Sequence, residues 1–315
     1  MAVQMKIEIT SELGLTKEQQ SILIAHSFVN IVNVLKDNFT RLRKTCRWEK
    51  FAENSMRCCQ ELEESFRSEE KTAYEIEQAQ KHLDTFRDDL AEIAEAVASN
   101  STFSPETRRE VDARISNIES VLSIFIFRAR EAMARKNVWR KWVYLPFDEI
   151  KGQLCDFLEA TEKNSMGNFC IAYDMRDKKE KDYLVEFDFK SADGGDECLM
   201  PSYMPDTIRD LVANARKYGH PGGRIGIKLV DDGKTTTLEI SDDGMGIPEN
   251  EIESVVGFGK RGSNTAEDQK KGCGCGLTKA YFLCKSFKGR MWVDSEESKS
   301  TTVTVAIPHP APDAA

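Results

Sequence analysis

Three polar side chains recur at helical spacing in the segment IRDLVANARKY, residues 208–218. Asp210, Asn214 and Lys217 stand at positions i, i+4 and i+7, so a helix would place an acid, an amide and an amine on one face. The residues on the opposite face are apolar: Ile208, Leu211, Val212 and Ala215. The pattern is typical of a solvated polar face above a buried back. A binding site is the alternative, and the segment alone does not decide between them.

Two glycine-containing segments lie further along the chain. SDDGMGIP starts at Ser241, where two glycines allow the backbone to approach a ligand and Asp242 can accept a hydrogen bond. GCGCG, residues 272–276, precedes a helical pattern, and glycines at a helix N-terminus expose N–H groups to an anion. A simple acidic turn is the competing interpretation of the first segment. For the second, Cys273 and Cys275 add a metal clip and a redox pair to the alternatives.

The composition excludes several classes of protein. The chain has 315 residues, enough for two domains with cores of their own. Its formal net charge of −9 argues against a nucleic-acid binder, which usually carries a basic excess. No apolar run approaches the ~20 residues of a membrane helix, and the N-terminus lacks a signal-peptide pattern. We therefore expect a cytoplasmic protein without a membrane span, whose nine cysteines are free thiols.

Residues 1–141 are predicted to form a helical domain. A capping box from Thr16 to Gln19 begins one helix, and Ser104 followed by Pro105 begins another. Both helices carry apolar residues at a four-three spacing, namely Ile24, Phe28, Ile31, Leu35 and Leu42, and then Val111, Ile115, Ile118, Leu122, Phe125, Ala129 and Ala132. Because one hairpin cannot cover such stripes, we expect a homodimer. Residues 49–99 are charged, and we interpret them as one or two solvated helices that flank the bundle.

Residues 142–308 are predicted to form a second domain of helices and strands. A helical pattern over residues 150–161 precedes DYLVEFDF, whose alternation indicates a strand. RIGIKLV and TTTLEIS flank a hairpin signal at residues 231–233, and RMWVDS and TTVTVAIP form a further pair of short strands. We therefore expect an α+β fold, with an N-terminal helical bundle followed by an α/β sandwich that has a mixed, largely antiparallel sheet. Residues 309–315 are expected to be a disordered tail.

The order of these polar segments resembles the ATP-binding domain of the GHKL superfamily, and within it the sensor histidine kinases. LVANARKYG is similar to the N box of that family, SDDGMGIP to its G1 box, and GFGKRGSN to its F box. The stretch from GCGCG to residue 308 is similar to the G2 box and the closing hairpin. The resemblance covers residues 144–308, about half of the chain, and implies a GHKL-type sandwich.

The resemblance implies ATP and Mg²⁺ as cofactors and gives roles to residues in these boxes. Asn214 would be the Mg²⁺ ligand, Lys217 would contact phosphate, and Tyr218 would line the nucleotide pocket. Asp242 would accept from the adenine amino group, and Asp210 would polarise water or a metal-bound group. Glycines beside the base and residues of a lid over the phosphates complete the implied site: Gly244, Gly246, Phe258, Lys260, Arg261, Gly272, Gly274, Gly276 and Leu277.

Cys273 and Cys275 occupy variable positions of the implied G2 motif, which favours a phosphate loop over a metal or redox site. A helix N-terminus can lower the pKa of a thiol, so oxidative inhibition through these two cysteines stays a hypothesis. Asp243 departs from the family pattern, because the kinases more often carry Asn there.

A phosphoacceptor is implied in the first helix. SILIAHSFVNIVNVLKDN resembles an H box, with His26 as the acceptor and Asn30 four residues later on the same face. His26 is expected to point outward, away from the apolar seam that Ile24 marks. Ser27 replaces the acidic residue that usually follows the histidine, and a hydroxyl is a poor base. His82 is a rival acceptor that lacks the surrounding motif.

These features predict the core of a two-component histidine kinase. It would autophosphorylate and pass the phosphoryl group to an aspartate of a response-regulator receiver domain. No sensor domain is visible in the sequence, so a separate sensor protein or the long helices would supply the input. The alternative that Ser27 favours is a nucleotide-binding regulator with little kinase activity, which acts by binding a partner protein. Another GHKL enzyme, such as a mitochondrial-type protein serine kinase or an anti-sigma factor, is a further alternative.

Overall fold

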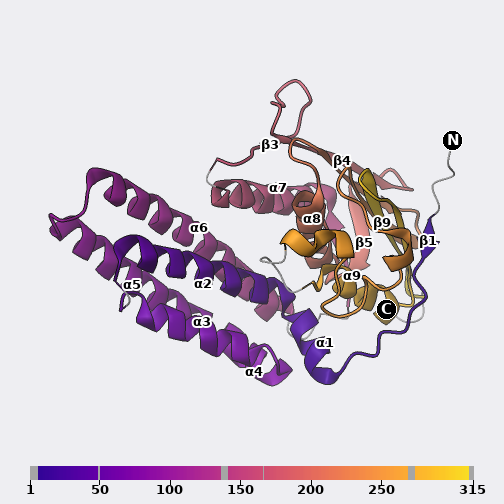
Figure 1. Cartoon of the computed structure of the whole chain (residues 1–315). Coiled ribbons are helices and arrows are strands. Elements are labelled where there is room, and N and C mark those ends of the chain that lie inside the picture. The colour runs from indigo at the N-terminus through magenta and orange to yellow at the C-terminus, as the bar shows by residue number, and fades with distance from the viewer. Residues whose placement is uncertain (1–5, 49, 136–140, 166, 269–273, 312–315) are drawn as a thin grey trace. The chain divides into compact units, whose positions relative to one another are not determined.

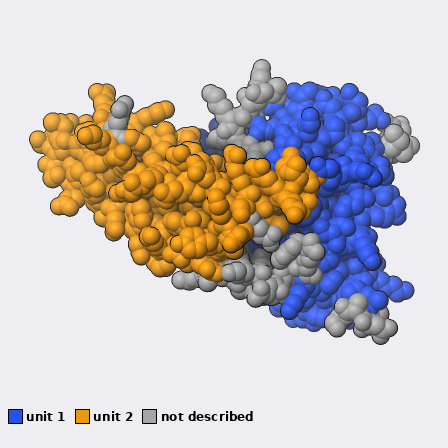
Figure 2. All heavy atoms as spheres, turned by 90° about the horizontal axis from the view of Figure 1, so that it is seen from below, with its two compact units in different colours: residues 1–14, 138–315 blue, residues 15–137 orange. Residues whose placement is uncertain are grey.

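The chain is described by a computed structural model that covers residues 6–48, 50–135, 141–165, 167–268 and 274–311 (Figure 1). It forms two compact units, which are coloured in Figure 2. One unit contains residues 15–137 and is helical. The other contains residues 1–14 together with residues 138–315 and holds the β-sheet. Each unit has a hydrophobic core of its own.

Four helices of the helical unit pack into a bundle. α2 (His26–Cys46) packs along α6 (Pro105–Arg135), while α3 (Glu53–Ser65) and α5 (Ala79–Ser99) close the bundle against them (Figure 1). The shorter α1 (Lys17–Ile24) and α4 (Glu69–Glu77) precede α2 and α5. The expected capping box is confirmed, since the Gln19 N–H donates to Thr16 Oγ1 at 3.2 Å and the Thr16 N–H donates to Gln19 Oε1 at 2.9 Å.

The predicted apolar seam of α2 is confirmed at Phe28, Leu35 and Leu42 and differs at its other two positions. The buried positions are Ala25, Phe28, Val32, Leu35, Phe39 and Leu42, whereas Ile24 and Ile31 are only partly buried. Ala25 ends α1 and begins α2, so Ile24 belongs to a different helix from the rest of the stripe. In α6 the predicted stripe is buried at Val111, Ile118, Leu122, Phe125 and Ala129.

Residues 49–99 were expected to be solvated helices beside the bundle, and that expectation is wrong. Their apolar side chains lie inside the core that α2 and α6 contribute to: Leu62, Phe66, Leu83, Phe86, Leu90, Ile93 and Val97 are each no more than 5% exposed. Phe86 stacks on Phe39 of α2 and meets Phe125 of α6 edge-on. The stripes of α2 and α6 are therefore covered within one chain, and they no longer require a second copy.

The second unit contains a seven-stranded mixed sheet in the order β1-β8-β9-β7-β6-β4-β3. Its strands are β1 (Ile7–Glu8), β3 (Ile171–Ala172), β4 (Tyr183–Ser191), β6 (Arg224–Asp231), β7 (Thr235–Asp242), β8 (Arg290–Glu296) and β9 (Ser300–Pro308). The β3–β4 and β4–β6 pairs are parallel, and the other pairs are antiparallel. The predicted α+β fold with a largely antiparallel sheet is thus confirmed, as are the hairpins β6–β7 and β8–β9.

Helices and a small second sheet cover the large one. α8 (Met204–Tyr218) packs on β6 and β7, while α9 (Gly276–Ser286) packs on β8 and β9 and against α8 (Figure 1). α7 (Phe147–Asn164) contacts β2 (Trp142–Pro146), which pairs with β5 (Glu197–Pro201). Two 3₁₀ turns, η1 (Glu249–Glu251) and η2 (Ser263–Asp268), lie between β7 and α9. The apolar faces of α8 and α9 meet the sheet in one core.

The N-terminal segment belongs to the sheet unit, although we expected residues 1–141 to be helical. β1 pairs with β8, and Ile9 is 1% exposed within the sheet core. The Tyr281 hydroxyl, which has one hydrogen to donate, lies 3.1 and 2.8 Å from the carbonyl oxygens of Ile9 and Ser11. Glu253 accepts hydrogen bonds from the backbone and side chain of Ser11. The helical unit is consequently an insertion in the sheet unit, joined to it by the chain at two places.

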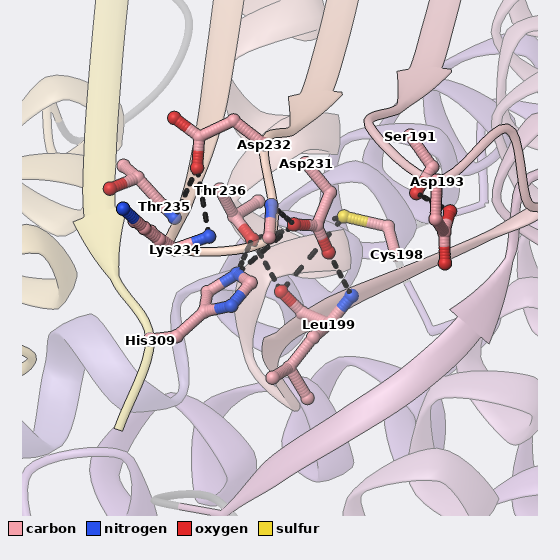
Figure 3. A network of polar contacts seen from close by, with 11 residues as sticks. Ser191, Asp193, Cys198, Leu199, Asp231, Asp232, Lys234, Thr235, Thr236 and His309 are labelled. Atoms are coloured by element: carbon pink, nitrogen blue, oxygen red, sulfur yellow. Dashed lines mark hydrogen bonds and ion pairs between the residues drawn. The ribbon is translucent and has the colours of Figure 1, made fainter. Parts of the chain in front are cut away.

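A polar network joins the β6–β7 hairpin to β5 and to the C-terminal segment (Figure 3). Asp231 accepts from the Leu199 N–H at 2.9 Å, and its Oδ1 lies 3.3 Å from His309 Nε2. The Thr236 hydroxyl lies 3.1 Å from the same ring nitrogen, and the His309 N–H donates to the Lys234 carbonyl. His309 is thus held by the hairpin and is not part of a disordered tail, while residues 312–315 lie outside the described ranges.

Candidate functional site

α8 presents the first part of the candidate site. Asp210 is 9% exposed, and its Oδ2 lies 2.6 Å from Lys279 Nζ of α9. Asn214 follows one turn later and is partly buried. A Cβ added at Gly276, the first residue of α9, would lie 2.5 Å from Asn214 Nδ2. The amide of Asn214 therefore lies directly against the N-terminus of α9, in a space that only glycine leaves open.

Lys217 and Tyr218 close the last turn of the same helix. Lys217 Nζ donates to the Tyr218 hydroxyl at 3.0 Å and lies 4.6 Å from the centroid of the Tyr218 ring. Both side chains are partly buried. A lysine ammonium held over a tyrosine ring is fixed in position while its charge still reaches solvent, and such a group suits contact with an anion.

The last residue of β7, Asp242, places a partly buried carboxylate beside a glycine turn. Asp242 Oδ1 accepts from the Gly244 N–H at 3.0 Å. Gly244 forms an isolated bridge with Gly219, and a Cβ on it would lie 2.2 Å from the Tyr218 carbonyl oxygen. Burial raises the pKa of Asp242 to about 7, the Gly244 hydrogen bond opposes that shift, and the charge of Asp243 adds to it. This carboxyl is thus poised between its two protonation states near neutral pH.

Gly246 and Asn264 complete the turn. Gly246 has a φ of 66°, and a Cβ on it would lie 2.2 Å from the Glu296 carbonyl oxygen. The position therefore needs glycine for both its conformation and its space. Asn264 Nδ2 donates to the carbonyls of Met245 and Gly246 at 3.2 and 3.0 Å. Sequence reasoning missed Asn264, whose only signal was its place at the end of the GFGKRGSN motif.

The residues predicted for the lid are described in part. Phe258 and Arg261 are partly buried, and Lys260 is exposed. The Thr278 hydroxyl of α9 donates to the Gly257 carbonyl at 3.0 Å, and a Cβ on Gly274 would lie 3.0 Å from the Lys260 carbonyl oxygen. Leu277 packs against the sheet core. The structure therefore brings the F-box segment to the start of α9, while Gly272 lies outside the described residues.

The cysteines correct one expectation. Seven of them are free thiols: Cys46, Cys58, Cys59, Cys155, Cys170, Cys198 and Cys284. Cys275, which is 1% exposed immediately before α9, is disulfide-bonded, so the prediction of free thiols throughout is wrong at this residue. Cys273 lies outside the described residues.

His26 does not point outward as predicted. It is the first residue of α2 and is only 5% exposed. Its Nε2 lies 3.4 Å from Asn30 Nδ2 across one helical turn. An amide N–H can only donate, so this contact favours the tautomer in which Nε2 carries the lone pair. The side chain of Ser27 lies outside the description.

His82, the rival acceptor, has partners at both ring nitrogens. Its Nδ1 lies 3.0 Å from the Cys58 sulfur, and its Nε2 lies 2.7 Å from Glu75 Oε2. His82 of α5 is 8% exposed, and its two partners lie on α3 and α4. Burial raises the pKa of the Cys58 thiol to about 12, so the sulfur stays a thiol and no thiolate nucleophile forms. This arrangement joins α3, α4 and α5 and offers no free nitrogen to a phosphoryl donor.

Part of the chain is similar to known proteins. Residues 204–311 match the family described as histidine kinase-, DNA gyrase B- and HSP90-like ATPase. The sensor histidine kinase WalK of Bacillus subtilis is 23% identical over 72% of this chain and 34% of its own length. The haem sensor protein HssS of Staphylococcus saprophyticus is 28% identical over 50% of this chain and 32% of its own length. The chain thus spans about a third of these relatives.

A solved structure is also similar to the chain. The Acinetobacter baumannii histidine kinase AdeS matches 76% of this chain and 98% of its own, at 15% identity and a TM-score of 0.39. Among the described residues, no helix is both long enough and apolar enough to cross a membrane. Residues 204–311 are thus similar to the histidine kinase-, DNA gyrase B- and HSP90-like ATPase family, and the relatives named above include a sensor histidine kinase.

Proposed function

We propose that this chain is the core of a two-component histidine kinase, which binds ATP with Mg²⁺ and transfers the γ-phosphoryl group to one of its own histidines. The observation that carries the proposal is the contact between Asn214 and Gly276, with Asp242 in the neighbouring turn. This arrangement brings together an amide that can bind a metal, a helix N-terminus that can bind an anion, and a carboxylate that can accept a hydrogen bond from a base.

The nucleotide would be held at both ends. Ionised Asp242 accepts from the adenine amino group, which selects adenine over guanine, and the turn at Gly244 and Gly246 lets the backbone pass the base. Lys217 reaches the phosphates, with Tyr218 lining the pocket. The amide oxygen of Asn214 is a hard ligand that fits Mg²⁺, and the missing Cβ at Gly276 leaves room beside it. The ion, when bound, neutralises charge on the phosphate oxygens.

The acceptor that we propose is His26. In the tautomer that Asn30 favours, Nε2 has the lone pair that attacks the γ-phosphorus, while the bond from that phosphorus to the β-bridging oxygen breaks and ADP leaves. Because His26 is 5% exposed, the start of α2 has to open before the transfer. The phosphoryl group would then pass to an aspartate of a response-regulator receiver domain.

A nucleotide-binding regulator with little kinase activity is the second candidate. The burial of His26 favours it, as does Ser27 in place of the usual acid. In that case nucleotide binding would control the grip of the helical unit on a partner protein, and no phosphohistidine would form.

Three further expectations belong to the same proposal, namely a cytoplasmic location, input from a separate sensor protein, and a homodimer. The apolar stripes of α2 and α6 no longer support a homodimer, because α3 and α5 of the same chain cover them. In the described part of the helical unit, the exposed large hydrophobics are Val34 and Tyr74 alone. Sedimentation equilibrium of the full chain would decide between one copy and two.

Incubation of the full chain with γ-labelled ATP and Mg²⁺ tests the proposal. We expect acid-labile, base-stable label that is lost in His26→Ala and in Asn214→Ala. His82→Ala should keep the label, as should Asn33→Ala at an exposed position of α2. Loss of label in His82→Ala with a folded protein would move the acceptor. Nucleotide binding without any label would favour the regulator, and acid-stable label on serine would indicate a protein serine kinase.

A further inference from the structure

Lys279 is a buried cation next to the candidate nucleotide site. Its side chain is fully buried, and its ammonium lies 2.6 Å from Asp210 Oδ2. The same ammonium lies 4.9 Å from the centroid of the Tyr203 ring at the start of α8. A buried ammonium is costly unless it is paired and hydrogen-bonded. These contacts satisfy that requirement, and they involve none of the groups proposed to touch the nucleotide.

The ion pair and the site share the same two helices. Asp210 precedes Asn214 by one turn of α8, and Gly276 precedes Lys279 by about one turn of α9. The pair Asp210–Lys279 and the contact Asn214–Gly276 are therefore consecutive contacts along one helix–helix crossing. A charged hydrogen bond has a narrow range of distances, so the first contact sets the relative position of the helices at the second.

We propose that Lys279 is a positioning residue, which holds the amide of Asn214 against the N-terminus of α9 by its ion pair with Asp210. The inference rests on the proposed nucleotide site. It also changes the role expected for Asp210, whose carboxylate is engaged by an ammonium and so acts in positioning Asn214, not in polarising a water molecule. The pair serves the metal and phosphate end of the nucleotide, since Asp242 at the base end belongs to a different loop.

Charge pairing, more than the shape of either side chain, is what this role requires. Lys279→Met leaves Asp210 as a buried carboxylate without its ammonium, and Asp210→Asn leaves the ammonium without its carboxylate. Replacing both removes the two charges together and restores an electrically neutral contact between the helices. The two single changes should therefore be strongly non-additive.

The test is a double-mutant cycle in the full chain, with affinity for Mg·ATP and for adenosine measured by calorimetry. We expect each single variant to weaken Mg·ATP binding by about tenfold or more while adenosine binding changes by less than about twofold, and the double variant to recover most of the loss. Lys285→Met makes the same chemical change at an exposed position of α9 and should leave both affinities unchanged.

Thermal unfolding of each variant accompanies the binding measurements. Equal weakening of Mg·ATP and adenosine, or additive losses in the double variant, would show that the pair only supports the fold and would overturn the inference. Failure of the proposed function has a different signature, because the wild type would then bind neither ligand. If the wild type binds both ligands and the variants bind them equally well, the positioning role of Lys279 is refuted while the nucleotide site stands.

Discussion

Adenosine should bind more weakly as the pH falls from 8 to 5, because Asp242 must be ionised to accept from the adenine amino group. Burial raises the pKa of Asp242 to about 7. At pH 8 about nine-tenths of the carboxyls would be ionised and at pH 5 about one in a hundred, so the dissociation constant should rise by up to roughly 90-fold. Adenosine is the right probe, since it has no phosphate to titrate in this range.

Calorimetry between pH 5 and pH 8 checks this prediction. Asp242→Asn serves as the control, because an amide does not titrate and its weaker binding should be flat with pH. An affinity of the wild type that stays constant over this range would refute the reasoning, because either the carboxyl would not be buried or it would not contact the base.

The same pKa predicts the stability of the empty protein. The folded-state value of about 7 lies above the ordinary value of 3.8, so the ionised carboxylate opposes folding and stability falls as pH rises between these two values. The difference of about three pH units between these pKa values corresponds to a loss of at most about 4 kcal/mol in the free energy of unfolding. Asp242→Asn should therefore unfold at higher urea concentration than the wild type at pH 8, and the difference should vanish near pH 4. An equal difference at both pH values would contradict the assignment.

Gly276→Ala should weaken Mg·ATP binding by about tenfold or more, because the new methyl would displace the amide of Asn214; Gly152→Ala, where a Cβ meets nothing within 4 Å in an exposed part of α7, is the matched control for the binding titration. Tyr281→Phe removes the hydroxyl that donates to the segment after β1 and should lower the free energy of unfolding by about 1–3 kcal/mol. Hydrogen exchange should then show faster opening of β1, and unchanged protection there would refute the role. His82→Phe should lower the free energy of unfolding, measured by urea denaturation, by about 1–3 kcal/mol, because it removes the contacts with Cys58 and Glu75. An unchanged urea midpoint would show that these contacts contribute nothing to stability.

Local signals in the sequence were sufficient for much of the sheet unit. The alternation of β4 and the turn residues at 231–233 depend on neighbours in sequence, and both elements were predicted. The glycine positions of the site were also readable, because Gly244 and Gly246 are required by the turn itself.

Other features could not be predicted from the sequence, because they depend on contacts between residues far apart along the chain. Residues 7–8 are too short a stretch to indicate a strand, and β1 exists because β8 offers an edge 282 residues away in the Glu8–Arg290 contact. The charged composition of residues 49–99 suggested solvation, yet their apolar residues are buried by α2 and α6. Composition counts side chains and does not tell which face of a helix has a neighbour.

By itself, the sequence determined the fold class, the motif order and the residue types around Asn214 and Asp242, because periodicity and turn chemistry are local properties. Only the tertiary structure decided that His26 is buried, that His82 contacts Cys58 and Glu75, and that Lys279 pairs with Asp210. The physical reason is that burial and ion pairing depend on which distant segments meet.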